Sequence, residues 1–157
     1  MKSFYTMLVF VVISGLTISL VKAQTSATPM RPLEKANPWK DSQLIEPAGL
    51  ADVINNPKTD VPVIFNIGSV EDVKDAKHIG PVSNVAEMEK FKREVNSLPR
   101  NSEIIIYCGC CPFAKCPNIR PAFFELTKLG FTNIKVLNLA ANLKTNWISK
   151  GYPLANN

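Results

Sequence analysis

The stretch SEIIIYC, residues 102 to 108, has the pattern of a strand buried on both faces of a sheet. Its three consecutive isoleucines are β-branched, and such residues favour strands. A second apolar run, VPVIFNIG at residues 61 to 68, has the same character and is flanked by Asp60 and Gly68. Two strands of this kind predict a parallel sheet with helices packed on both faces.

Helical patterns alternate with the apolar runs. Further strands are expected at residues 44–45 and 134–139. Helices are predicted from Pro47, at Ser69 with Asp72 as a capping box, from 85 to 98 behind the cap pair Asn84 and Glu87, from 119 to 129, and in a last short segment with Leu143, Trp147 and Ile148. This alternation predicts a single α/β domain at residues 42–157, with a central, mainly parallel sheet and helices on both faces.

The N-terminus predicts export. Lys2 supplies a positive charge, residues 7–21 form an apolar run, and Val21-Lys22-Ala23 resembles a signal-peptidase site, so residues 1–23 are predicted to be a signal peptide. The mature protein is then periplasmic or secreted, without stable membrane insertion. Residues 24–41 are polar and rich in proline, which predicts a flexible lead-in whose Trp39 is able to dock on the domain.

The charge gives little support for a nucleic-acid partner. The formal net charge is +5, and removal of Lys2 and Lys22 with the signal peptide lowers it to +3. The most basic segment, KFKREV at residues 90 to 95, contains a compensating Glu94. No nucleic acid is expected to bind, because binding requires a strongly basic patch.

The stretch CGCCPFAKCPNIR, residues 108 to 120, holds all four cysteines. Cys108 closes the predicted strand, and the loop after it runs into the helix predicted from residue 119. In parallel sheets, ligands bind at the carboxyl ends of strands, beside the N-termini of the helices that follow. We therefore expect the functional site at Cys108.

The order of these motifs resembles that of the rhodanese family of sulfurtransferases. The resemblance rests on IIIYC with Cys108, on Arg120, on LTKLGFTNIKVL, on the tail from Trp147 to Pro153, and on His78-Ile79 within FNIGSVEDVKDAKHIGPV. This chain departs from the family pattern in three places. Asn66-Ile67-Gly68 replaces the frequent Asp-Val-Arg, HIGP replaces HIPG, and eleven residues separate Cys108 from Arg120, a longer loop than the family has.

The resemblance implies a rhodanese-like domain in which Cys108 is the catalytic residue and carries sulfur as a persulfide. The partners would be a small sulfur donor such as thiosulfate and an acceptor, a thiol or cyanide. Backbone N–H groups of the loop and the positive end of a helix dipole stabilise a thiolate or persulfide anion. The expected substrate-binding residues are Gly109, Cys110, Cys111, Lys115 and Arg120, the last two through their positive charges. No cofactor is expected.

Several alternatives stay open for the same residues. Cys108 is otherwise a buried strand-end cysteine, and His78 is either a turn histidine or part of a Cys-His pair. Cys110, Cys111 or Cys116 could resolve a persulfide as a thiol-disulfide relay, or a Cys111–Cys116 disulfide could brace the loop. A non-catalytic module that binds Cu(I) or Zn(II) is a further alternative, but no metal is assigned, because the adjacent Cys110 and Cys111 cannot easily face one ion.

Overall fold

The computed structural model describes residues 36–56, 58 and 60–155. The predicted signal peptide and most of the predicted lead-in lie outside the described residues. The elements in chain order are a 3-10 turn η1 (Asp41–Gln43), β1 (Leu44–Ile45), α1 (Pro47–Asn55), β2 (Val63–Asn66), β3 (Ala76–His78), α2 (Val85–Asn96), β4 (Ile104–Tyr107), η2 (Phe113–Lys115), α3 (Ile119–Lys128), β5 (Ile134–Leu137), α4 (Leu143–Asn146) and η3 (Ile148–Lys150).

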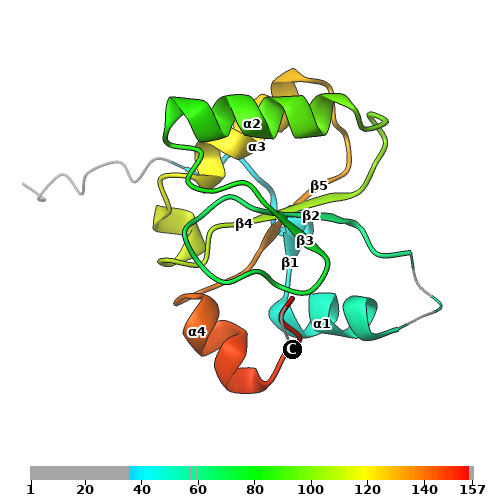
Figure 1. The fold of residues 1–157 in the computed structure, drawn as a ribbon, viewed down its shortest axis with the longest axis vertical. Coiled ribbons are helices and arrows are strands. Elements are labelled where there is room, and N and C mark those ends of the chain that lie inside the picture. Colours follow the sequence, from blue (N-terminus) through cyan, green and yellow to red (C-terminus); the bar gives the residue numbers. More distant parts are fainter. Residues whose placement is uncertain (1–35, 57, 59, 156–157) are drawn as a thin grey trace, which may run out of the picture. The chain divides into compact units, whose positions relative to one another are not determined.

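The five strands form one sheet in the order β1-β5-β4-β2-β3, and every neighbouring pair is parallel. The central strand β4 pairs with β2 through Val63 and Ile104 and with β5 through Ile104 and Ile134. Helices α2 and α3 lie on one side of the sheet and α1 and α4 on the other (Figure 1). The predicted α/β class, with a single domain and helices on both faces, is confirmed.

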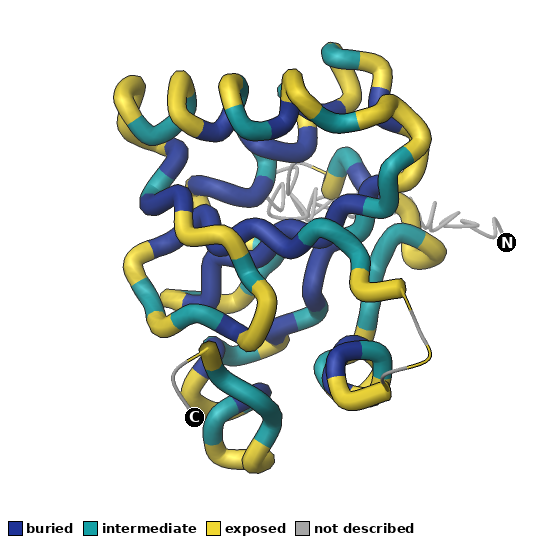
Figure 2. Tube along the Cα trace, turned by 45° about the vertical axis from the view of Figure 1, so that its right-hand side comes forward, coloured by how far each residue is buried: buried dark blue, intermediate teal, exposed yellow. Residues whose placement is uncertain are grey.

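The sheet divides the core into two layers, and strand alternation assigns each side chain to one of them. From β4 and the residue after it, Ile104, Ile106 and Cys108 pack in the layer of α2 and α3. Ile105 and Tyr107 pack in the opposite layer, with α1 and α4. Figure 2 shows the buried central strands between the more exposed outer helices. Cys108 therefore belongs to the layer that also contains the start of α3.

The predicted short helix at Ser69–Asp72 is wrong. Residues 69–75 form bends and turns that lead into β3, a strand that the sequence did not predict. The Asp72 carboxylate contacts the side chains of Asn66 and His78 and does not cap a helix. The Tyr107 hydroxyl accepts a hydrogen bond from the Val73 N–H at 2.9 Å. Because β3 lies at the sheet edge and is largely exposed, its sequence AKH has no apolar pattern.

The predicted side-chain cap of α2 is not formed. Asn84 is the N-cap residue of α2 by its backbone conformation, but its side chain makes no capping hydrogen bond. The other predicted helices begin within the expected segments. Among the described residues, none of the helices is long and apolar enough to span a bilayer.

Candidate functional site

Cys108 lies directly after β4, at the carboxyl edge of the sheet, and only 1 % of its surface is exposed. The chain turns away at Gly109, whose φ of +76° is a conformation that side chains disfavour. A Cβ on Gly109 would also lie 2.8 Å from Val70 and 2.9 Å from Leu143. The Leu143 N–H donates to the Gly109 carbonyl oxygen at 2.8 Å, so the start of α4 holds this turn in place.

Gly68 lies against Cys108 from the neighbouring strand. An ideal Cβ at Gly68 would be 2.1 Å from the Cys108 carbonyl oxygen and 2.9 Å from its Sγ atom. No side chain fits in this space. The position of Cys108 therefore requires a glycine at position 68.

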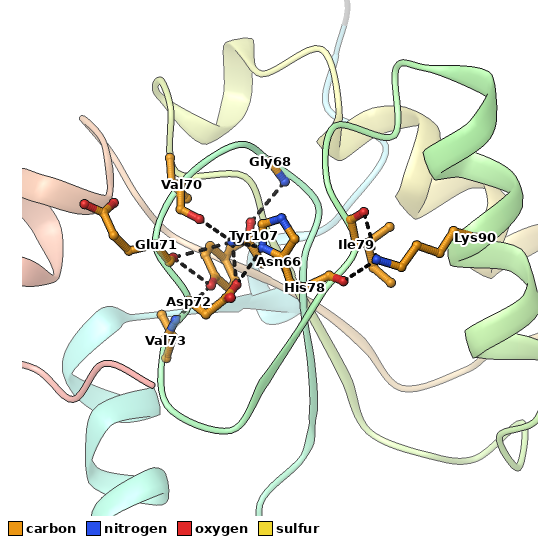
Figure 3. A network of polar contacts seen from close by, with 10 residues as sticks. All are labelled: Asn66, Gly68, Val70, Glu71, Asp72, Val73, His78, Ile79, Lys90 and Tyr107. Atoms are coloured by element: carbon orange, nitrogen blue, oxygen red, sulfur yellow. Dashed lines mark hydrogen bonds and ion pairs between the residues drawn. The ribbon is translucent and has the colours of Figure 1, made fainter. Parts of the chain in front are cut away.

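A polar network anchored by Asn66 supports the loop that carries Gly68 (Figure 3). The Asn66 side chain is fully buried, and its Oδ1 accepts from the Gly68 N–H at 3.0 Å. Its Nδ2 donates to the Val70 carbonyl oxygen and to Asp72 Oδ1, each at 2.8 Å. The Asn66 side chain thereby satisfies backbone groups of Gly68 and Val70 that no helix satisfies here, and it holds Gly68 against Cys108.

The single histidine belongs to this network and not to the sulfur cluster. His78 Nδ1 lies 2.9 Å from Asp72 Oδ1 and 3.3 Å from Asn66 Nδ2. In the described part of the chain, no hydrogen bond links His78 to a cysteine. The sequence predicts a histidine that hydrogen-bonds the backbone at a turn. In the structure His78 ends β3, and its ring contacts the side chains of Asp72 and Asn66 instead.

The loop brings three sulfur atoms together. The Sγ atoms of Cys108, Cys110 and Cys116 all lie within 4.8 Å of one another, and the Cys108–Cys110 distance is 3.3 Å. Cys111 lies beside Cys110, with the Sγ atoms 3.4 Å apart, but it is outside this group of three. All four cysteines are free thiols in this structure, so the Cys111–Cys116 disulfide is not formed in it.

Asn118 is a site residue that the sequence analysis did not identify. It is the N-cap residue of α3, and its side chain is 4 % exposed. Its Nδ2 donates to Cys108 Sγ at 3.2 Å, and its Oδ1 accepts from the Ser83 N–H at 2.8 Å. An asparagine directly before a predicted helix is a usable sequence signal, but it suggests a helix cap, and here the side chain serves the sulfur instead.

The surroundings of Cys108 favour its thiolate. Hydrogen bonding from the Cys116 thiol, opposed by burial and assisted by Asn118 and Cys110, lowers the pKa of Cys108 to about 5. Burial and the hydrogen bond with Cys108 raise the pKa of Cys110 to about 12. The hydrogen bond with Cys108, followed by burial, also raises the pKa of Cys116, while the N–H groups of Asn118 and Ile119 oppose that change. The cluster thus holds one thiolate that is stabilised by neighbouring thiols.

Of the two predicted cationic substrate residues, Arg120 binds the segment that precedes the sheet, and Lys115 is exposed in the cysteine loop. Arg120 donates to the Ala36 carbonyl oxygen at 3.0 Å and to Asn37 Oδ1 at 2.7 Å, and its guanidinium lies 5.5 Å from the ring centroid of Trp39. Lys115 is exposed at the end of η2. These contacts connect Arg120 with the residues that precede the sheet, and its role in substrate binding stays a prediction.

Trp39 anchors the segment before the sheet that Arg120 contacts. The indole is 6 % exposed and packs on Phe113 and Phe123, with ring centroids 5.8 Å away in both cases. Because Phe113 lies within the cysteine loop and Phe123 within α3, the docked Trp39 braces the loop from outside. The end of the predicted lead-in is therefore packed on the domain.

No protein-family model matches this chain, and a comparison with curated proteins found no match. The described residues by themselves define an α/β protein with a cysteine-based site. A buried, low-pKa thiol lies at the carboxyl edge of a parallel sheet, with two further thiols and a side-chain amide around it. Such a site can act as a nucleophile, as a redox couple or as a ligand for a thiophilic ion.

Proposed function

We propose that this chain is an exported, rhodanese-like sulfurtransferase in which Cys108 carries sulfane sulfur as a persulfide. One observation carries the proposal. The Cys108 sulfur, at the carboxyl end of β4, receives hydrogen bonds that lower the pKa of its thiol to about 5. A thiolate at neutral pH is the species that attacks sulfur, and the same donors would stabilise the persulfide anion that results.

The proposed reaction has two balanced steps. The Cys108 thiolate attacks the outer sulfur of thiosulfate, the sulfur–sulfur bond of the donor breaks, and sulfite leaves with the electron pair. An acceptor thiolate or cyanide then attacks the outer sulfur of the persulfide, which regenerates the Cys108 thiolate. Neither step needs an external oxidant or reductant, and each is an exchange at sulfur.

The surroundings of Cys108 support its assignment as the carrier over the other cysteines. Cys110 is exposed, but its raised pKa leaves it protonated at neutral pH. Cys116 is buried and has a raised pKa as well. The resemblance of the motifs around Cys108, Arg120 and the C-terminal tail to the rhodanese pattern is further support.

The proposal is tested by intact mass. Reduced mature protein treated with thiosulfate is expected to gain about 32 Da, the mass of one sulfur atom, and dithiothreitol should remove this gain. Cys108→Ser should abolish the gain, and Phe124→Ala, a substitution of an exposed residue outside the expected substrate site, should keep it. A gain that persists in Cys108→Ser would refute the assignment of Cys108.

A second function, a thiol-disulfide relay, is favoured by the 3.3 Å distance between the sulfurs of Cys108 and Cys110. The Cys110 thiol would attack the inner sulfur of the Cys108 persulfide and give up its proton to the departing outer sulfur, which forms a Cys108–Cys110 disulfide and releases hydrosulfide. Persulfidated protein left without acceptor should then liberate sulfide and end about 2 Da below the reduced mass. Persulfide that persists unchanged under these conditions would argue against the relay.

A further inference from the structure

The three clustered thiols have the arrangement of a metal site. Metal–thiolate bonds of about 2.3 Å place three sulfurs around one ion about 4 Å apart when the ion lies in their plane. The sulfurs of Cys108, Cys110 and Cys116 lie within 4.8 Å of one another, and those of Cys108 and Cys110 are 3.3 Å apart. The three sulfurs are therefore already at the separations that one shared ion requires, to within about 1 Å.

The spacing of the cysteines would argue against a metal site only if the adjacent Cys110 and Cys111 both had to bind the same ion. Cys111 lies outside the group, and its place is taken by Cys116, which follows η2. The loop between them returns to the sheet edge, where the Phe113 N–H donates to the Leu139 carbonyl oxygen at 3.1 Å. The tertiary structure thus removes the objection that the adjacent Cys110 and Cys111 raise.

The three sulfurs are held by well-supported elements. Cys108 closes the central strand of the sheet, and Cys116 lies just before α3, where the N–H groups of Asn118 and Ile119 are directed at its sulfur. The Asn118 amide holds Cys108 Sγ at 3.2 Å. Hydrogen bonds of this kind to ligand atoms orient a metal site and reduce the cost of concentrating thiolate charge. Cys110 is exposed and offers an entry path.

The donor set selects among metals. The group contains sulfur ligands alone, and the ring of His78 is engaged by Asp72. Soft thiolates favour Cu(I) and Zn(II), but structural Zn(II) sites take four ligands. Three sulfurs in a plane satisfy Cu(I), which binds soft thiolates and does not require a fourth ligand.

We propose that Cys108, Cys110 and Cys116 form a three-thiolate site that binds one Cu(I) ion. Binding displaces the thiol protons to solvent and changes no oxidation state. The site goes beyond sulfur transfer and does not require it. If Cys108 also carries a persulfide, a consequence that rests on the proposed function, then bound Cu(I) and the persulfide exclude each other.

The test is titration of anaerobic, fully reduced mature protein with Cu(I) against a chromogenic Cu(I) chelator. We expect one Cu(I) per chain, and X-ray absorption should detect three sulfur ligands at about 2.3 Å. Cys108→Ser, Cys110→Ser and Cys116→Ser should each weaken binding at least about tenfold, as the loss of a ligand requires. Cys111→Ser is the matched control, because it removes a neighbouring thiol outside the group, and it should retain the wild-type affinity.

Several outcomes would overturn the site. These are a sulfur count of two or four in the wild-type protein, an equal loss of affinity in Cys111→Ser, or full affinity in Cys108→Ser. Tighter binding of Zn(II) with all four cysteines as ligands would also overturn it. The wild-type sulfur count does not depend on the folding of any variant. A protein that gains sulfur from thiosulfate but binds no Cu(I) would refute the metal site alone, and the reverse result would refute sulfur transfer alone.

Discussion

The side-chain amide of Asn118 connects the cysteine site to the loop before α2. Its Nδ2 donates to Cys108 Sγ at 3.2 Å, and its Oδ1 accepts from the Ser83 N–H at 2.8 Å. Since the second bond fixes which end of the amide faces the sulfur, Asn118 presents a donor and not an acceptor to Cys108. This orientation favours a negative charge on the sulfur.

Asn118→Leu should therefore weaken the Cys108 thiolate. The substitution nearly preserves the shape and removes a hydrogen bond to a charged group, which is worth about 1.5–3 kcal/mol. Below pH 5, where the Cys108 thiol of the wild type is itself being protonated, persulfide formation should become about tenfold slower or more. The measurement is the rate of the mass gain with thiosulfate. The exposed Asn101→Leu serves as the control and should react at the wild-type rate.

The ionisation of Cys108 should depend on Cys116. Because the pKa of Cys108 is lowered, the thiolate persists at neutral pH and is lost as the pH falls through about 5. Thiolate ultraviolet absorbance of the reduced protein should accordingly show one transition near pH 5. Cys116→Ala removes the principal donor and should move this transition upward, toward the ordinary thiol value. An unchanged transition in Cys116→Ala would show that another group stabilises the thiolate.

Gly68→Ala should disturb the site and the fold together. The new Cβ would overlap the carbonyl oxygen of Cys108, and overpacking of this kind costs about 1–3 kcal/mol of unfolding free energy. Gly49→Ala is the matched control, since a Cβ there meets nothing within 4 Å and the position is helical. The control should stabilise the protein by about 0.5–1 kcal/mol. Urea unfolding of both variants measures the contrast, and equal effects would contradict the packing described at Gly68.

Removal of Trp39 should detach the segment that precedes β1. Truncation of a buried aromatic side chain costs about 3–5 kcal/mol, and Trp39→Ala also removes the ring on which Arg120 lies. Phe124→Ala is the matched control, because it truncates an aromatic residue that is 51 % exposed. It should change the unfolding free energy by about 0.5 kcal/mol or less. Limited proteolysis should cleave Trp39→Ala near residues 36–41 faster than the wild type. Equal stability of the two variants would mean that Trp39 does not brace the domain.

The strands and long helices could be predicted because burial leaves a direct pattern in the sequence. Residues 104–107 are buried at every position, and the stripe that includes Ala122 and Leu126 faces the core as its spacing indicates. The region from Ser69 to His78 was mispredicted for the opposite reason. Its conformation depends on Asn66 and Tyr107, which are supplied by other strands, and neither leaves a local signal there.

The features of the candidate site likewise fall into those that local sequence predicts and those that depend on distant contacts. That Cys108 ends a buried strand and precedes a helix could be predicted from the amino-acid sequence, because chain order and apolar patterning are local properties of the polypeptide. Three other features depend on the folded chain: Cys116 rather than Cys111 joins Cys108 and Cys110, Asn118 binds the Cys108 sulfur, and Arg120 lies against Trp39. These features could not be predicted because packing and hydrogen bonds with distant residues set the path of a long loop, and the spacing of cysteines along the chain does not encode those contacts.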